Sequence, residues 1–481
     1  MALDGDAATS EVGPPAPSAR GAQGASLPSD NNHDFVILGG GVAGLTFALE
    51  ASRRGRRVVL LEGEDQVGGL ARTMRFGDFR FDIGGHRFHS RWPEITQWVL
   101  AALDGDAAEV PRRSRIRLNG RFVDYPLRFP NLLGVFNPWQ ATRILASYMW
   151  ATIARLRKRP DVSFEDWIVR RFGRSLYDIY FKPYTEKVWG FSCTDLSADW
   201  AAQRIRVPSL RAAVVGSLLR RSPAPSTLLS QFLYPSLGIG VLPECLAAKA
   251  RQTGRATIRL GSRVTRVEPD GASGGWRVIF RGSEGEASVT GGRLVSTIPL
   301  EALLGMLPMP RAEVGALAAG LSYRSLACVF LAVDGSRISN DTWTYFPDRH
   351  LVFGRTHEPG NWSPRMVPEG KTSLCAEIFC SEGDEVWNRP DQDVIEPVLA
   401  DLDRLRFLPR SRVREAWMLR VSHAYPVYRV GYAEHRSRVS SALSRWPTLH
   451  LLGRTGTFRY LNLDAVIREG LDLAGSLCQG P

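Results

Sequence analysis

Apolar positions near the start of the chain predict two strands with a helix between them. Residues 35–38 (FVIL) and 58–61 (VVLL) are short, continuous apolar runs, typical of strands that are buried on both faces. Residues 42–53 have a helical pattern, and three glycines stand between the first strand and this helix. Strand, glycine turn, helix and strand in this order predict one βαβ unit of a parallel sheet.

A second group of strands is predicted in the middle of the chain. Residues 112–128 alternate between polar and apolar side chains around Asn119 and Gly120, which predicts a hairpin with a type I′ turn. Residues 321–333 and 371–380 alternate or run apolar as sheet strands do. Together these segments indicate a mixed sheet that is separate from the βαβ unit.

Most of residues 139–221 follow a helical pattern. Within this region, Ser163 and Asp166 have the spacing of a capping box at a helix start. Residues 222–228 are rich in Pro and Ser and are expected to form a linker loop. Residues 234–250 predict a glycine turn that leads into another helix.

The first glycine turn has the G-x-G-x-x-G spacing of a dinucleotide-binding site. Gly39 allows a tight turn, Gly41 lets the backbone approach a pyrophosphate, and Gly44 lets the helix pack close to its strand. Glu62 ends the second strand, where a carboxylate can accept hydrogen bonds from a ribose hydroxyl. A glycine triplet alone is a weak signal in a chain with 46 glycines, so the flanking strands and the acid carry this prediction.

A second glycine pair favours FAD over a nicotinamide dinucleotide. Gly68, Gly69 and Arg72 follow the βαβ unit directly, and FAD binds in an extended form that touches such a second loop. Residues 449–477 predict a strand, a Gly-Arg turn and a helix that begins near Asp464. This helix could bring a second N-terminus to the cofactor, so the two ends of the chain are expected to build one site.

These motifs carry a family resemblance over nearly all of residues 33–478. The two glycine loops and the C-terminal Gly-Arg pair resemble the FAD-dependent amine oxidase and protoporphyrinogen oxidase clan. YFKPYTEKVWG (180–190) and GRTGTFRYLNLD (453–464) resemble UDP-galactopyranose mutase. The resemblance implies an α/β fold with a discontinuous, glutathione-reductase-like Rossmann FAD domain, a helical insert and a mixed-sheet substrate domain.

On this basis we expect each domain to draw on distant parts of the chain. Residues 1–30 lack the basic start and apolar core of a signal peptide and are expected to be a disordered tail. The expected boundaries are 31–104, 233–300 and 445–478 for the FAD domain, 105–138 and 301–444 for the substrate-side sheet domain, and 139–232 for the helical insert.

The resemblance also assigns residues to the substrate and to the cofactor. His86 lies in the stretch that runs past the isoalloxazine ring, where it would contact the flavin or assist proton transfer; a histidine satisfied by backbone groups is the alternative. Arg204, Arg355 and Tyr460 align with mutase residues that bind the substrate diphosphate, and the alternative for each arginine is a surface or FAD-facing ion pair. The residues expected to bind FAD are Gly39, Gly41, Gly44, Glu62, Gly69, Arg72, Gly85, Arg454, Asn462 and Asp464, and no metal site is expected.

Two departures from the mutase pattern bear on the reaction. Asn462 stands where the mutase has an acid, and residues 205–237 are apolar and basic where the mutase has an asparagine- and tyrosine-rich substrate segment. We therefore favour an oxidoreductase in which FAD takes a hydride from a polar small molecule of the sugar or nucleotide-sugar type. The alternatives are a non-redox UDP-sugar pyranose/furanose mutase, in which N5 of reduced flavin acts as the nucleophile, and a flavin-free scaffold.

Composition narrows the range of partners. The 481 residues carry a net charge of +12, which nucleic acid, anionic lipid, an anionic small molecule or an arginine-rich codon bias could explain. No nucleic-acid module and no apolar run of about 18 residues is present, so we expect an anionic or sugar-like substrate, no nucleic acid and no membrane association. Six cysteines without a C-x-x-C pair indicate a reducing, cytoplasmic location without disulfides or zinc.

Overall fold

The computed structural model of the chain describes residues 33–125, 135–155, 159–205, 230–271 and 274–479. The expected tail at residues 1–30 and the expected linker at residues 222–228 lie outside the described residues. No helix in the described residues combines the length and the apolar character needed to cross a membrane.

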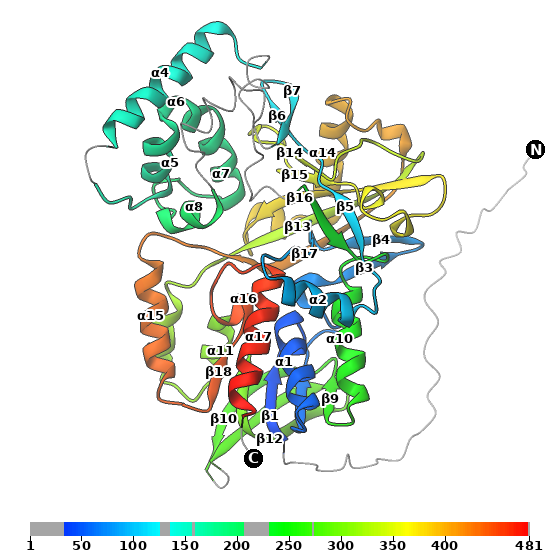
Figure 1. Ribbon diagram of the computed structural model, residues 1–481, viewed down its shortest axis with the longest axis vertical. Coiled ribbons are helices and arrows are strands. Elements are labelled where there is room, and N and C mark those ends of the chain that lie inside the picture. Colours follow the sequence, from blue (N-terminus) through cyan, green and yellow to red (C-terminus); the bar gives the residue numbers. More distant parts are fainter. Residues whose placement is uncertain (1–32, 126–134, 156–158, 206–229, 272–273, 480–481) are drawn as a thin grey trace, which may run out of the picture. The chain divides into compact units, whose positions relative to one another are not determined.

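The first sheet has seven strands, which come from both ends and the middle of the chain (Figure 1). Five of them are parallel and lie in the order β18-β12-β1-β2-β9. Strands β10 and β11 extend the sheet as an antiparallel meander beside β12. The strands are β1 (His33–Leu38), β2 (Val58–Leu61), β9 (Ala256–Arg259), β10 (Arg263–Asp270), β11 (Gly275–Gly282), β12 (Gly285–Ser296) and β18 (Leu449–Leu451).

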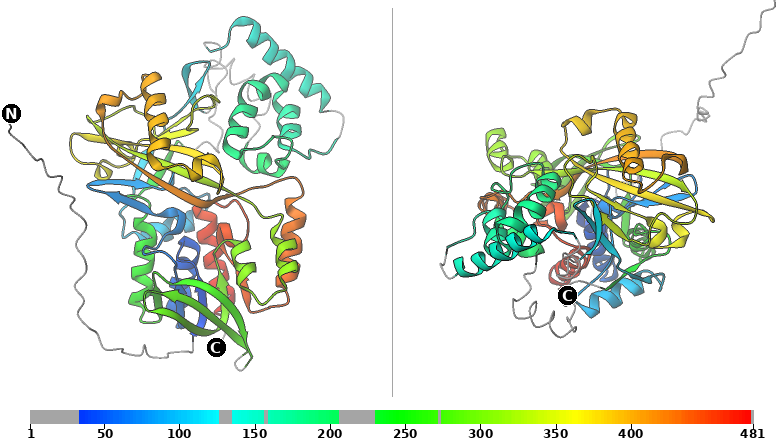
Figure 2. Two further views of the ribbon diagram at one scale, coloured as in Figure 1. Left: turned by 180° about the vertical axis from the view of Figure 1, so that it is seen from behind. Right: turned by 90° about the horizontal axis from the view of Figure 1, so that it is seen from above.

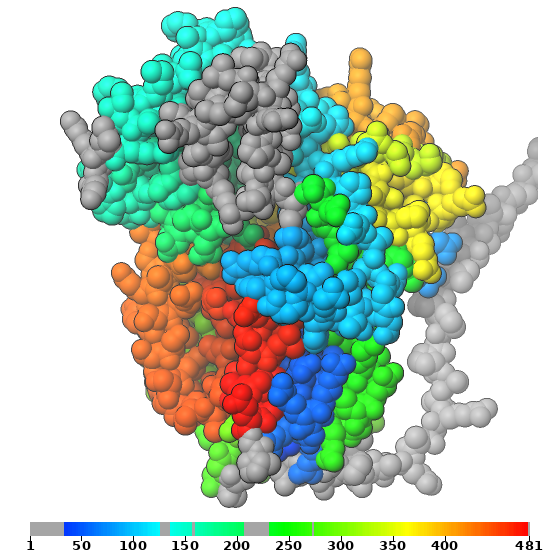
Figure 3. All heavy atoms as spheres, viewed as in Figure 1, coloured from blue at the N-terminus to red at the C-terminus, as the bar shows by residue number. Residues whose placement is uncertain are grey.

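Three helices cover one face of this sheet, and they come from distant parts of the chain. Helix α1 (Val42–Arg53) lies between α10 (Val241–Gln252) and α17 (Leu463–Leu477), and Figure 3 shows the blue, green and red helices side by side. Their apolar side chains share one buried cluster with Phe35 and Ile37 of β1. The predicted meeting of the two chain ends is therefore confirmed.

The opposite face of the first sheet packs against the antiparallel meander. Val36 and Val59 share a buried cluster with Val278 and Phe280 of β11, and from behind the green meander strands lie in front of α1 (Figure 2). Three further helices contribute side chains to this cluster or pack against it, namely α11 (Leu300–Met306), α12 (Arg311–Ala318) and α15 (Tyr432–Leu443).

The second sheet is mixed and has the order β17-β13-β16-β15-β14-β6-β7. Its hairpin β6–β7 turns at Asn119 and Gly120, whose φ angles of 48° and 77° are those that a type I′ turn requires, so this prediction is confirmed. The strands are β6 (Ser114–Leu118), β7 (Arg121–Tyr125), β13 (Tyr323–Asp334), β14 (Trp343–Tyr345), β15 (Arg355–His357), β16 (Lys371–Cys380) and β17 (Val413–Pro426). Helices α13 (Glu385–Asn388) and α14 (Asp391–Arg404) follow β16.

Helices form a separate layer at one end of the second sheet (Figure 1). Ser163 caps α5 with the predicted capping box, because its hydroxyl accepts from the Asp166 N–H and the Asp166 carboxylate accepts from the Ser163 N–H. A π-helical turn (Tyr177–Phe181) precedes Pro183, which has no N–H to continue the α pattern. The helices are α4 (Pro138–Ala154), α5 (Phe164–Phe172), α6 (Arg174–Leu176), α7 (Lys182–Trp189) and α8 (Ala198–Arg204).

Two small antiparallel sheets link the larger ones. The pair β3 (Thr73–Phe76) and β4 (Phe79–Asp82) precedes α2 (Pro93–Ala102), and β5 (Ala108–Pro111) pairs with β8 (Gln231–Tyr234). The loop after β4 crosses between them, since Phe88 and Leu233 exchange backbone hydrogen bonds. The predicted α/β class, with its Rossmann-type sheet assembled from distant segments, a helical insert and a mixed sheet, is confirmed.

Candidate functional site

The first glycine loop leaves the start of α1 open toward an anion. Gly39 has φ of +97°, and a Cβ at Gly44 would lie 2.3 Å from the Gly39 carbonyl oxygen, so neither position accepts a side chain. A Cβ at Gly41 would meet nothing within 4 Å. No side chain caps α1, and its first turn holds no acid, so its N–H groups can donate to a phosphate in that space.

Glu62 is held beside the same loop. Its Oε2 accepts a hydrogen bond from the Gly40 N–H at 2.6 Å, and its Oε1 accepts one from the Glu64 N–H at 2.9 Å. The carboxylate therefore has a fixed position at the end of β2, where the sequence motif predicts contact with a ribose.

The second glycine loop docks onto the first. The Gly68 N–H donates to the Gly40 carbonyl at 2.8 Å, and a Cβ at Gly69 would lie 3.4 Å from the Gly41 Cα. Arg72 braces this loop, because its Nε donates to the Gly69 carbonyl at 3.0 Å and its guanidinium lies 3.4 Å from the Glu64 carboxylate. Both loops predicted to contact FAD thus form one surface.

The C-terminal segment completes this surface. Gly453 begins the short helix α16 (Gly453–Gly456), and a Cβ there would lie 2.7 Å from the Ala43 side chain of α1. Asn462 is the N-cap of α17 but makes no cap hydrogen bond; its Oδ1 instead accepts from Arg204 at 3.3 Å. Asp464 is buried in the first turn of α17.

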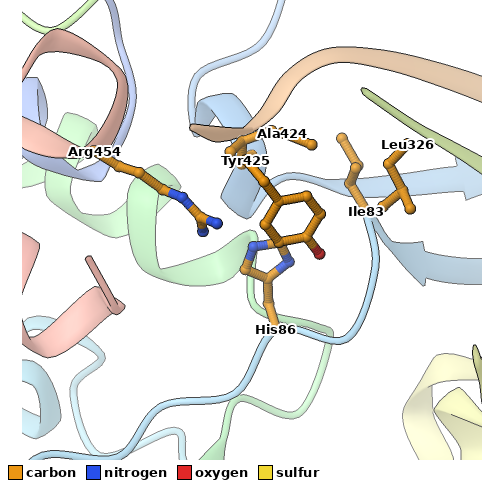
Figure 4. A pocket seen from close by; sticks show the side chains of 7 residues that line it. Ile83, His86, Leu326, Ala424, Tyr425 and Arg454 are labelled. Atoms are coloured by element: carbon orange, nitrogen blue, oxygen red, sulfur yellow. The ribbon is translucent and has the colours of Figure 1, made fainter. Parts of the chain in front are cut away.

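A pocket opens where these segments meet the second sheet (Figure 4). Two of its lining residues carry buried polar atoms without a partner, namely His86 Nδ1 and the Nε and Nη2 atoms of Arg454. Gly85 has a packing role here, since a Cβ would lie 2.2 Å from the Trp343 indole nitrogen. The lining residues are Leu70, Ile83, His86, Leu326, Ala424, Tyr425 and Arg454.

These features fit an extended flavin dinucleotide. The glycine loops leave room for a pyrophosphate, and the uncapped N-terminus of α1, which has no acid in its first turn, can donate to it. The orphaned nitrogens of His86 and Arg454 offer hydrogen bonds to a polar ring system between apolar walls.

Arg355 is held in place by a buried carboxylate that the sequence reasoning missed. Glu377 is fully buried; it accepts from Arg355 Nε at 2.9 Å and also pairs with Arg355 Nη2, while His357 Nδ1 lies 3.3 Å from its Oε1. Burial raises the pKa of Glu377, but Arg355 and His357 outweigh this effect and lower the pKa to about 2. A charged residue within the apolar run of β16 was the available signal.

Three arginines meet at two stacked tyrosines, which we call the arginine–tyrosine cluster. Tyr425 and Tyr460 stack with ring centres 5.8 Å apart. The guanidinium of Arg204 lies 3.7 Å from the Tyr460 ring, and that of Arg454 lies 4.2 Å from it. Arg355 donates to the Tyr425 hydroxyl at 3.4 Å. Of the residues predicted to bind substrate, Arg204, Arg355 and Tyr460 thus come together, and Tyr425 was missed.

His86 faces the same cluster, as Figure 4 shows for its approach to Tyr425 and Arg454. The pKa of His86 is lowered to about 4, mainly because the ring is buried, and the positive charge of Arg454 acts in the same direction. The imidazole is therefore neutral at pH 7 and can accept a hydrogen bond at an unprotonated nitrogen.

Comparison with known proteins agrees with this geometry. A tobacco (Nicotiana tabacum) chloroplastic protoporphyrinogen oxidase is 21% identical over 85% of this chain and 79% of its own length. A Klebsiella pneumoniae protein named "Probable UDP-galactopyranose mutase" is 25% identical over 35% of this chain and 44% of its own. The crystal structure of reduced UDP-galactopyranose mutase superposes with a TM-score of 0.80 at 24% identity, covering 92% of this chain and 95% of that one.

A family profile covers most of the chain. The family described as flavin-containing amine oxidoreductase matches residues 42–475, which include both glycine loops, the pocket and the C-terminal helix. Members of this family use FAD, which is the cofactor that the loops and the pocket fit. The chain belongs to the flavin-containing amine oxidoreductase family and is an FAD-dependent flavoenzyme.

Proposed function

We propose that this flavoenzyme oxidises an anionic small molecule of the sugar or nucleotide-sugar type. The arginine–tyrosine cluster carries the proposal, because it gathers Arg204, Arg355 and Arg454 beside the pocket. In the described part of the chain, Glu377 is the one carboxylate that forms an ion pair with any of the three.

Three guanidinium groups and one carboxylate leave a local excess of positive charge, which an anionic ligand would offset. Arginine binds phosphate in a bidentate manner, and a phenol hydroxyl can donate a further hydrogen bond. Burial tends to raise the pKa of Tyr460, but Arg204, Arg454 and Arg355 outweigh it and lower that pKa. The structural resemblance to a protein titled UDP-galactopyranose mutase supports a sugar diphosphate as the anion.

The chain's own residues bind and orient the substrate. When bound, FAD supplies a two-electron acceptor that takes a hydride from a substrate C–H bond. A pKa of about 4 makes His86 a weak base at neutral pH, so we infer that it accepts a hydrogen bond and orients its partner. The apolar wall of Leu70, Ile83 and Leu326 limits water around the reacting groups.

Anaerobic mixing of the oxidised holoenzyme with candidate sugar phosphates and nucleotide sugars tests the proposal. A substrate should bleach the visible band of the flavin without added reductant. Arg204→Gln should keep FAD and lower the bleaching rate at sub-saturating substrate by roughly tenfold or more, as expected for one charge-assisted hydrogen bond. Arg75→Gln, at an exposed position on β3, is the matched control. Bleaching by amines and never by anionic sugars would overturn the proposed substrate class.

The obvious variant, Arg355→Ala, is unsuitable because it would leave the charge of Glu377 buried without its partner. Tyr460→Phe is a better second probe, since it removes one hydroxyl and keeps the stacked ring.

Non-redox isomerisation of a UDP-sugar is the second candidate, and the superposition on reduced UDP-galactopyranose mutase favours it. The discriminating measurement is turnover by dithionite-reduced enzyme under anaerobic conditions. Conversion of a UDP-sugar to an isomer with no net consumption of electrons would establish the mutase. Activity that needs oxidised flavin and an electron acceptor would establish the oxidoreductase.

A further inference from the structure

Two more arginines, one next to the pocket residue His86 and one directly after β5, form no ion pair within the described residues. Arg87 directly follows His86, and its guanidinium lies 4.9 Å from the centre of the Trp343 ring. Arg112 directly follows β5, and its guanidinium lies 5.6 Å from the centre of the Tyr125 ring. Both side chains are partly buried. We call these two residues the Arg87–Arg112 pair.

Neighbouring arginines on β6 show how structural arginines are accommodated in this region. Arg115 forms an ion pair with Asp341 at 2.6 Å, and Arg117 forms one with Asp348 at 2.6 Å. Arg112 instead donates its Nε to the uncharged Ser114 hydroxyl at 3.2 Å. Within the described residues, Arg87 and Arg112 therefore differ from Arg115 and Arg117 in having no carboxylate partner.

Strand β14 joins the surroundings of the two arginines. Trp343 begins this strand, and Tyr345, two residues later, lies 5.4 Å from the Tyr125 ring that Arg112 covers. The strand also pairs with β6, so Trp343 is opposite Ser114 in the ladder. The Arg87–Arg112 pair thus shares one aromatic wall formed by Trp343, Tyr345 and Tyr125.

The same wall continues toward the arginine–tyrosine cluster. The Tyr345 ring lies 6.0 Å from the Tyr184 ring. Burial raises the pKa of the Tyr184 phenol, and the positive charge of Arg355 acts in the opposite direction. Burial and the charge of Arg112 lower the pKa of Arg87 to about 10, and Arg355 and Arg204 act in the same direction. The ring contacts from Tyr125 through Tyr345 to Tyr184 thus lead from the Arg87–Arg112 pair toward the cluster.

Holding partly buried guanidinium groups together without a counterion costs free energy. Contact with aromatic faces offsets part of this cost for each arginine, but it does not remove the repulsion between the two charges. An oxyanion between them would remove it, and each guanidinium has free N–H donors for such a ligand.

We propose that Arg87 and Arg112 form a second oxyanion subsite, which binds a carboxylate or phosphoryl group of the substrate in addition to the anion at the arginine–tyrosine cluster. This inference rests on the proposed function, because it extends the same substrate pocket. It narrows the substrate class to small molecules with two anionic groups separated by a polar body, such as a sugar phosphate with a second charged substituent.

Three probes that differ only at carbon 6 of the sugar test the subsite. They are glucose 1-phosphate, glucuronic acid 1-phosphate, which adds a carboxylate, and glucose 1,6-bisphosphate, which adds a phosphoryl group. Each is titrated into the FAD-loaded enzyme, and the perturbation of the flavin spectrum gives its dissociation constant. At least one of the two charged probes should bind about tenfold more tightly than glucose 1-phosphate. The one with the greater gain identifies the group that the subsite takes.

Variants separate the subsite from the rest of the pocket. Arg87→Gln and Arg112→Gln should each raise the dissociation constant of the favoured charged probe about tenfold. The dissociation constant of glucose 1-phosphate should change by less than about twofold in both variants. Arg87→Lys should recover part of the loss because it keeps the charge. Arg113→Gln is the matched control, since this exposed neighbour of Arg112 carries the same charge outside the pair. Retained FAD in every variant shows that the fold is intact.

The outcomes distinguish this subsite from the proposed function. Equal binding of all three probes to the wild type, or equal weakening of all three by Arg87→Gln and Arg112→Gln, would overturn the subsite and leave the proposed substrate class standing. Failure of all three probes to bind the wild type would overturn both.

Discussion

Glu377 is a fully buried carboxylate that remains charged because of its partners. Arg355 and His357 lower its pKa to about 2 although burial acts in the opposite direction. The ion pair between Glu377 and Arg355 also fixes the direction of the Arg355 guanidinium toward Tyr425. Arg355 on β15, which we propose binds the substrate anion, is thereby oriented before any ligand arrives.

Removing the Glu377 charge should strongly destabilise the protein. Glu377→Gln is expected to lower the free energy of unfolding by about 3–5 kcal/mol, because it leaves Arg355 buried without an anion. Urea unfolding at pH 7 measures the change. Asp334→Asn, which breaks an exposed ion pair with Arg414, is the control and should leave stability unchanged within error. Equal effects of the two variants would contradict a buried role for Glu377.

The sequence predicted those site residues that form local patterns. Gly39, Gly41 and Glu62 stand at spacings that one βαβ unit dictates, so their meeting requires no knowledge of the rest of the chain. Glu377 and Tyr425 come from strands β16 and β17, and only the sheet brings them beside Arg355. Their roles depend on pairing between distant strands, which periodicity does not determine.

At the scale of elements, Asp82 connects β4 to β8 and to the turn before α10. Its Oδ2 accepts from the Tyr234 hydroxyl at 2.6 Å, and its Oδ1 accepts from Thr73 Oγ1 at 2.7 Å and from the Ile239 N–H at 3.2 Å. Burial nevertheless raises its pKa from 3.8 to about 6, because these bonds do not fully compensate the lost hydration.

This raised pKa predicts a pH dependence of stability. The folded state holds the Asp82 proton more tightly than the unfolded state does. The contribution of protonated Asp82 to the free energy of unfolding is therefore fully present below pH 3.8 and is lost as pH rises through about 6. Asp82→Asn should remove the part of the pH dependence that lies between about pH 4 and 6. Urea unfolding of both proteins across this range measures the difference. Identical pH profiles would show that Asp82 is not the titrating group.

The cap of α5 predicts a smaller effect. Ser163→Ala removes the hydroxyl that accepts from the Asp166 N–H and should lower the free energy of unfolding by about 1 kcal/mol. Thermal or urea unfolding detects a change of this size. Ser441→Ala, at an exposed position inside α15, should cause no loss, since alanine is the better helix former. A comparable loss in both variants would argue against the cap.

At the scale of the molecule, the cofactor surface joins segments that lie more than 400 residues apart. The glycine loop after β1 and the helix pair α16–α17 pack together through Ala43 and Gly453. The sequence predicted this meeting from the glycine loops and from the helix expected near Asp464, whose N-terminus could reach the same cofactor. It did not predict that β6 pairs in parallel with β14, because that contact spans 229 residues between Ser114 and Trp343.

Two glycines in the first loop should therefore respond differently to substitution. Gly41→Ala adds a methyl group that touches nothing in the protein, so the apoprotein should keep its stability while its affinity for FAD falls at least about tenfold. Gly44→Ala forces its Cβ against the Gly39 carbonyl and should reduce both. FAD titration and urea unfolding of the apoproteins separate the two effects. Unchanged FAD affinity in Gly41→Ala would place the cofactor elsewhere.

The claim that an anion binds beside the flavin is tested most directly by titrating the FAD-loaded enzyme with inorganic pyrophosphate. The account predicts a saturable change in the flavin spectrum. The affinity for pyrophosphate should fall about tenfold in Arg204→Gln and stay the same in Arg75→Gln. A spectrum that does not change, or the same dissociation constant for wild type and Arg204→Gln, would contradict it.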